Sequence, residues 1–147
     1  MTNLRLAEAF LDRARARLKA LDGLRSEADF SDVIREARDI VELCLRGILR
    51  ISGIVVSRWM DVGDVLQENR SRLPADARAQ AERAIEIYRD LGRERPIALP
   101  EEGSAPVEKV LAADADRAIA DAEWVLGVAS LTVDLVAHRR VPSTPGR

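Results

Sequence analysis

The sequence predicts an all-α fold: an antiparallel four-helix up-and-down bundle with one additional short helix. Apolar residues recur at steps of three and four over four long segments, no segment alternates as a strand does, and most connections are short. A chain of 147 residues suits one domain with one core. We expect this domain over residues 1–137 and a flexible polar tail over residues 138–147.

The first helix is expected over residues 3–22, with Gly23 ending it. Its apolar positions, spaced by three and four, are Leu4, Ala7, Phe10, Leu11, Ala14, Leu18 and Leu21. Its later half is basic, which favours a solvated face with cations near the carboxyl end of the helix. The alternative for this basic run is a strip that contacts phosphates.

The central helix is expected from Phe30 to Ile51, with Asp29 or Ser31 as its cap and Gly53 as its stop. It carries a broad apolar stripe, formed by Phe30, Val33, Ile34, Ala37, Ile40, Val41, Cys44, Leu45, Ile48 and Leu49. Three opposite-charge pairs spaced by four lie on its other face: Arg35–Asp39, Arg38–Glu42 and Glu42–Arg46. This stripe predicts that the helix lies at the centre of the fold.

A short apolar connector follows over residues 53–60. Asp61 is placed to cap a third, short helix from Val62 to about Ser71. The fourth helix is expected from about Ala75 to Leu91, and Gly92 closes it.

Residues 93–112 are rich in Pro and predict an irregular surface segment, so the final helix is expected from Ala113 or Asp114. Alanines concentrate on the last two helices, which predicts that these two pack closely. The final helix has an apolar face as wide as the central one. The width left over around Trp124 suggests a further partner, such as a second copy of the chain.

Composition excludes several classes of function. A net charge of −2 gives no overall basic field for nucleic acid, and 3% aromatic residues leave little for a base-stacking surface. One Cys and one His cannot form an internal disulfide or an ordinary Cys/His zinc site. The charged N-terminus has no signal-peptide pattern and no apolar run is long enough to span a membrane, so we expect a cytoplasmic protein.

Candidate ligand-binding residues gather around the connector. Arg46, Arg50 and Arg58 could form an anion pocket for a nucleotide phosphate, with Trp59 as a stacking surface. The alternative is that these cations pair with Glu42, Asp61 and Asp64 while Trp59 packs on the bundle.

Three carboxylates, Asp61, Asp64 and Glu68, share one face of the third helix and could hold a divalent metal. The simpler interpretation is a cap at Asp61 and ion pairs for the other two, so no metal site and no cofactor is predicted. Cys44 is interpreted as a core residue and His138 as an exposed residue near the chain end.

The segment from Ile34 to Leu73 resembles a HEPN domain, a helical-bundle module of prokaryotic and some eukaryotic proteins. EARDIVELCLRGILRISGI (Glu36–Ile54) is similar to the family's helix of the form EA-x-x-x-VEL-x-LK-x-LL-x-x-x-GI, with Arg46 where a Lys is common. DVGDVL (Asp61–Leu66) is similar to a helix start that usually reads HDVG or HDL, and AIADAEWVL (Ala118–Leu126) to a late AxxDAExVL stretch. The resemblance to the family rests on the order and spacing of these motifs together, and not on any one of them.

The resemblance implies an all-α domain that dimerises across long helices. Many catalytic HEPN proteins are metal-independent RNases with an R-x(4–6)-H pair, because the reaction needs a group that moves the 2′-OH proton and a cation that holds the phosphate. Other members accompany a nucleotidyltransferase, often as a toxin–antitoxin pair, or bind nucleotides.

This chain departs from the catalytic pattern. Met60 stands before Asp-Val-Gly, where relatives often have His, and a methionine cannot move a proton. The single histidine is His138, and the positions where the spaced Arg would fall, residues 131–133, are Leu, Thr and Val. No catalytic residue is therefore predicted.

We expect a non-catalytic binding protein that acts as a homodimer. Its expected ligand or partner is a nucleotide, an RNA or a nucleotidyltransferase of a toxin–antitoxin pair. Two alternatives stay open: a metal-independent RNase with a non-standard site, and a structural dimerisation module.

Overall fold

The computed structural model describes residues 2–27, 30–93 and 107–140, and every regular element in these ranges is helical. The elements are α1 (Asn3–Ser26), α2 (Phe30–Ile51), α3 (Val62–Glu68), a 3₁₀ turn η1 (Arg70–Arg72), α4 (Ala75–Leu91) and α5 (Val107–Arg140). The prediction of an all-α chain is confirmed over the described residues.

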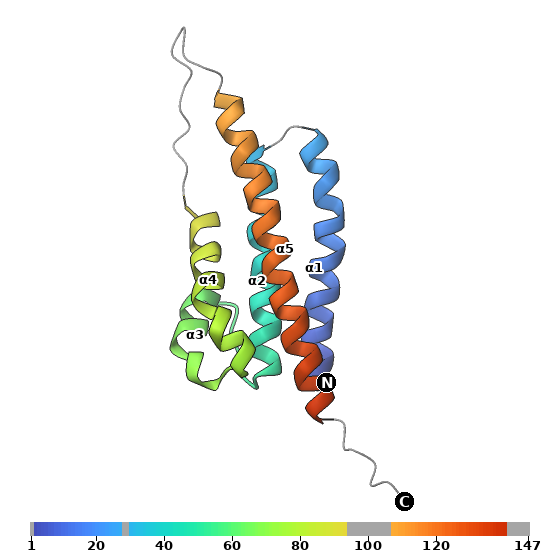
Figure 1. Cartoon of the computed structure of the whole chain (residues 1–147), viewed down its shortest axis with the longest axis vertical. Helices are drawn as coiled ribbons and strands as arrows, with labels where there is room; N and C mark the ends of the chain where they lie inside the picture. The colour runs from blue at the N-terminus through green and yellow to red at the C-terminus, as the bar shows by residue number, and fades with distance from the viewer. Residues whose placement is uncertain (1, 28–29, 94–106, 141–147) are drawn as a thin grey trace, which may run out of the picture.

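Three long helices form the body of the molecule. Figure 1 shows α1, α2 and α5 side by side, with α3 and α4 packed on one flank. Helix α2 contacts α1, α3, α4 and α5, and its two largest interfaces are with α1 and α5. Helix α4 has 17 residues against 34 in α5, so it covers only part of the length of its neighbour.

The apolar stripe of α2 explains its central place. Every predicted member of the stripe is buried except Phe30, which is half-buried against the core. Leu43, Gly47 and Ile51 are buried as well, so α2 is enclosed on more of its circumference than the stripe indicated. A Cβ atom at Gly47 would lie 3.2 Å from Leu11 Cδ2, which shows how closely α1 approaches α2 there.

Two of the glycines expected to end helices behave differently. Helix α1 continues through Gly23 to Ser26, whose hydroxyl donates to the Gly23 carbonyl at 2.8 Å, so the predicted end at residue 22 is wrong. Gly53 does end α2, and its φ of +79° is a conformation that favours glycine. Gly92 also ends its helix, α4, but with a φ of −86°, so a glycine in the sequence does not by itself fix where a helix ends.

The limits of α3 and α5 also differ from prediction. Helix α3 ends at Glu68, and η1 takes the place of its predicted last turn. Helix α5 begins at Val107 rather than at Ala113 or Asp114, because no Pro or Gly follows Pro106 to oppose the helix. It extends to Arg140, so the first residues of the expected tail are helical. The rest of that tail, Asp29, and residues 94–106 of the expected irregular segment lie outside the described residues.

The predicted close packing of α4 on α5 is corrected by the structure. The main partner of α5 is α2, and the interface between α4 and α5 is much smaller. Four alanines of α5 are buried in the core, where small side chains let α5 approach its neighbours closely: Ala115, Ala118, Ala122 and Ala129. The apolar width left on α5 faces a groove beside α4 instead of filling it.

The charges on the outer face of α2 pair differently from the prediction, and Arg35 pairs with Asp32 of its own helix at 3.5 Å. Arg17 of α1 donates to Glu36 at 2.6 Å and to Asp39 at 3.0 Å, so Asp39 does not pair with Arg35. The hydrogen bond to Glu36 raises the pKa of Arg17, which stays charged. Of the three predicted pairs, Glu42–Arg46 forms, at 3.2 Å.

Arg38 joins α2 to the end of α4. Its guanidinium lies 4.7 Å from the centre of the Tyr88 ring and donates to the Tyr88 hydroxyl at 3.2 Å. A Cβ atom at Gly92 would lie 2.7 Å from Arg38 Nε, too close for any side chain unless Arg38 moves. The predicted Arg38–Glu42 pair is therefore replaced by a contact across the helix interface.

We predict that Leu45→Ala lowers the free energy of unfolding by about 2–5 kcal/mol, because it removes a fully buried side chain from the most enclosed helix. Leu131→Ala is the matched control: Leu131 is 53% exposed, so its truncation should cost less than about 1 kcal/mol. Urea unfolding followed by circular dichroism measures both. Equal losses for the two variants would contradict the central place of α2.

Candidate functional site

The predicted cationic residues of α2 line a small hollow. Arg46 and Arg50 border it together with Phe10, Ile54 and Val56, and its volume is about 30 Å³. Arg46 is already paired with Glu42. Sites that hold small molecules and cofactors usually measure about 300–1,000 Å³, so this hollow has room for little more than one water molecule.

The other two predicted ligand-binding residues, Arg58 and Trp59, form a separate feature on the connector. The Arg58 guanidinium lies 4.8 Å from the centre of the Trp59 ring, and the Trp59 side chain is 84% exposed. The backbone N–H groups of Trp59 and Met60 donate to the hydroxyl and carbonyl of Ser57, at 3.4 and 3.1 Å. Arg58 does not line the hollow at Arg46 and Arg50, so the predicted three-arginine pocket is not assembled.

Asp61 and Asp64 have structural roles. Asp61 caps α3, and its carboxylate accepts from the Asp64 backbone N–H at 2.9 Å. The Asp64 carboxylate accepts from Arg89 of α4 at 3.0 Å, and Arg89 also donates to Gln67 at 2.8 Å. In the described part of the chain, no group of three His, Cys, Asp or Glu residues is arranged to hold a metal ion.

The connector concentrates exposed apolar side chains. Four large apolar residues among the described ones are more than half exposed, and three lie here: Val55 at 70%, Trp59 at 84% and Met60 at 55%. Ile54 and Val62, on either side, are buried and hold the connector to the core. We call Val55, Arg58, Trp59 and Met60 the connector patch. Several exposed large apolar side chains on one short segment are a candidate interaction surface.

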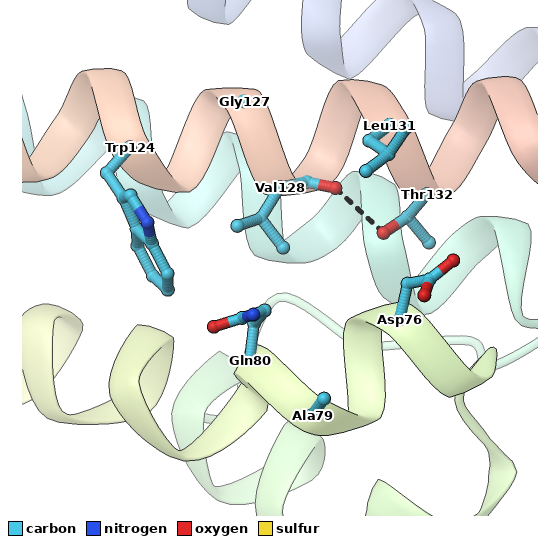
Figure 2. Close-up of a pocket in the computed structure, with 8 residues that line it drawn as sticks. All are labelled: Asp76, Ala79, Gln80, Trp124, Gly127, Val128, Leu131 and Thr132. Atoms are coloured by element: carbon cyan, nitrogen blue, oxygen red, sulfur yellow. Dashed lines mark hydrogen bonds between the residues drawn. The ribbon is translucent and has the colours of Figure 1, made fainter.

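A second candidate site, the α4–α5 groove, lies between the two helices, is open to solvent along one side and has a volume of about 400 Å³. Its wall from α4 consists of Asp76, Ala79 and Gln80, and its wall from α5 of Trp124, Gly127, Val128, Leu131 and Thr132. Figure 2 shows the Trp124 indole reaching toward α4 at one end of the groove and Asp76 at the other, with Gln80 and Val128 between them.

Two side chains of the α4–α5 groove are already engaged. The Thr132 hydroxyl donates to the Val128 carbonyl at 2.7 Å, and the Arg83 guanidinium lies 4.4 Å from the centre of the Trp124 ring (Figure 2 shows the first contact). From the sequence, only the spare apolar width around Trp124 pointed here. Asp76 and Gln80 were missed because they read as ordinary solvated positions of α4.

Comparison with known families identifies the fold. The family model described as HEPN domain matches residues 7–131. The chain belongs to the HEPN domain family. No curated protein and no solved structure gives a significant match to it. Among the described helices, none is both long enough and apolar enough to cross a membrane.

The structure also places the methionine, histidine and cysteine weighed in the sequence analysis. Met60 is exposed and carries no ionisable group. His138 lies with its Nδ1 3.0 Å from the Asp134 carbonyl of its own helix. Burial raises the pKa of the Cys44 thiol to about 12, so this cysteine is not a nucleophile near neutral pH.

Asp61→Ala should lower the free energy of unfolding by about 0.5–2 kcal/mol, because the backbone N–H of Asp64 loses its cap. Asp61→Asn keeps an acceptor oxygen and should remain within a few tenths of a kcal/mol of the parent. Chemical denaturation checks both values. An equal loss in the two variants would show that the charge of Asp61, and not its cap, is what matters.

Proposed function

We propose that this HEPN-family protein acts by binding, as a dimer, and that the connector patch recognises a partner protein of the nucleotidyltransferase class. The observation that carries the proposal is the exposed Arg58–Trp59 pair, flanked by Val55 and Met60 on a connector whose two ends are buried. Trp and Arg are enriched among the residues that carry most of the binding energy at protein–protein interfaces.

The stacked pair combines an aromatic surface with a charged group. The Arg58 guanidinium lies 4.8 Å from the centre of the Trp59 ring, so a partner that covers the ring also meets the cation. The rest of the Trp59 surface is open to solvent and would bury a large apolar area. Arg58 would add a charged hydrogen-bond donor at the rim of that contact.

The other functions fit this geometry less well. A nucleotide would need far more room than the hollow at Arg46 and Arg50 offers. An RNase of the ordinary HEPN type would need the R-x(4–6)-H pair that the sequence lacks. A purely structural dimer gives no reason for a Trp to stay exposed beside an Arg on a connector outside the long helices.

Incubation of the purified protein with mixed RNA in EDTA should leave the RNA intact, because the sequence lacks the R-x(4–6)-H pair that would move the 2′-OH proton and hold the phosphate. Gel electrophoresis of the RNA measures this. RNA cleavage that disappears in Arg58→Ala would overturn the binding proposal in favour of an RNase with a non-standard site.

Trp59→Ala should weaken binding to a nucleotidyltransferase encoded beside this protein's gene by at least about tenfold, the usual effect of removing a central aromatic anchor. Titration calorimetry measures the affinity. The melting temperature should not change, because the side chain is 84% exposed.

Leu131→Ala is the control for this experiment, since Leu131 is also exposed and lies outside the connector patch. It should bind like the parent. Light scattering of the free proteins gives a second readout. If Trp59→Ala converts a dimer to a monomer, the patch belongs to the dimer interface and the partner assignment is wrong; the absence of any complex with the parent protein would also contradict it.

A further inference from the structure

The α4–α5 groove has the size and lining of a small-molecule site, and it lies on other helices than the connector patch. Its volume of about 400 Å³ falls within the range of ligand pockets, and most of its wall is apolar. Gly127 adds to the open space, because a Cβ atom built there would meet nothing within 4 Å. A flat apolar group can therefore enter between Trp124 and Val128 without moving the backbone.

The chemistry of the α4–α5 groove differs between its two ends. At one end the Trp124 ring offers an aromatic surface, and Arg83 lies over that ring. At the other end stands Asp76, the one charged residue in the lining, and it makes no ion pair or hydrogen bond with the described residues. The Gln80 amide lies between the two ends (Figure 2).

These two ends favour one orientation and one class of ligand. An aromatic ring gains by stacking at Trp124, whereas a cation placed there would be repelled by Arg83. A cation at the opposite end would pair with the Asp76 carboxylate, which has no other partner among the described residues. An anion beside Asp76 would be repelled by its carboxylate.

We infer that the α4–α5 groove binds an aromatic amine, with its ring against Trp124 and its protonated amino group at Asp76. The Gln80 carboxamide sits beside the chain that joins ring and amine, where it can accept a second N–H of the ammonium group. The inference does not depend on the proposed partner protein, because it uses none of the residues of the connector patch.

The test uses the full chain with Trp59→Phe, which leaves Trp124 as its one tryptophan, since the sequence has two. The probes are phenethylamine and hydrocinnamate, which have similar rings and chains but opposite charge. Phenethylamine should change the Trp124 fluorescence along a saturable curve, and hydrocinnamate should bind at least about tenfold more weakly. Equal responses to both probes, or no saturable response to phenethylamine, would overturn the inference.

Two further substitutions in the same background locate the site. Gly127→Leu places a side chain in the open space and should abolish the fluorescence response, while the melting temperature stays the same or rises because a helix-interior glycine is replaced. Asp76→Asn should weaken phenethylamine up to about fivefold, as expected for one exposed ion pair, and should not weaken hydrocinnamate.

Phenethylamine binding that survives in a folded Gly127→Leu chain, or is unchanged by Asp76→Asn, would contradict the assignment. If Gly127→Leu does not fold, the test rests on Asp76→Asn: this variant should bind phenethylamine more weakly than its parent and should not bind hydrocinnamate more weakly. The outcome is distinct from that of the partner experiment, because the partner experiment compares chains that differ at Trp59, whereas this test compares chains that share Trp59→Phe and differ at Gly127 or Asp76.

Discussion

The burial of α2 is the interaction on which the rest of the structure depends. Twelve of its 22 residues are buried, which is more than one face of a helix can supply, and α1, α3, α4 and α5 all contact it. Each fully buried aliphatic side chain contributes about 1.5–3 kcal/mol relative to exposure, so the stripe from Val33 to Ile51 outweighs any single ion pair on the surface. The shorter elements α3 and α4 are held in place because they complete this burial on one flank.

Both candidate sites lie where the helices no longer cover one another. The connector patch follows directly after the end of α2, and the α4–α5 groove lies where α4 leaves part of α5 exposed.

Most of the fold could be predicted from the sequence because helical periodicity is a local signal. The limits of α2 and α4 and the cap at Asp61 follow from a stripe with clear ends and from one well-placed carboxylate. The continuation of α1 past Gly23 was missed, since whether a glycine ends a helix depends on its backbone conformation. The main contact of α5 was also missed: its alanines showed that some helix approaches closely but not that this helix is α2.

The candidate sites were harder to predict, because they depend on the direction in which side chains point. Arg46, Arg50 and Arg58 are near one another in the sequence, yet Arg46 turns to Glu42 and Arg58 stacks on its own neighbour. Asp61 and Asp64 took the simpler of the two roles considered for them, capping and ion pairing. The α4–α5 groove joins residues about fifty positions apart, and no local pattern brings Asp76 and Gln80 to Trp124. In the sequence, only the apolar positions of α5 around Trp124, more than one neighbouring helix could cover, indicated a possible binding surface at this place.

The contact between Arg38 and Gly92 has a consequence for the junction of α2 and α4. The guanidinium lies against Tyr88, and a Cβ atom at Gly92 would lie 2.7 Å from its Nε, so a larger residue at Gly92 would require the Arg38 side chain to move. Such a substitution would therefore act away from its own position, because displacing the guanidinium would disturb its contact with the Tyr88 ring and hydroxyl.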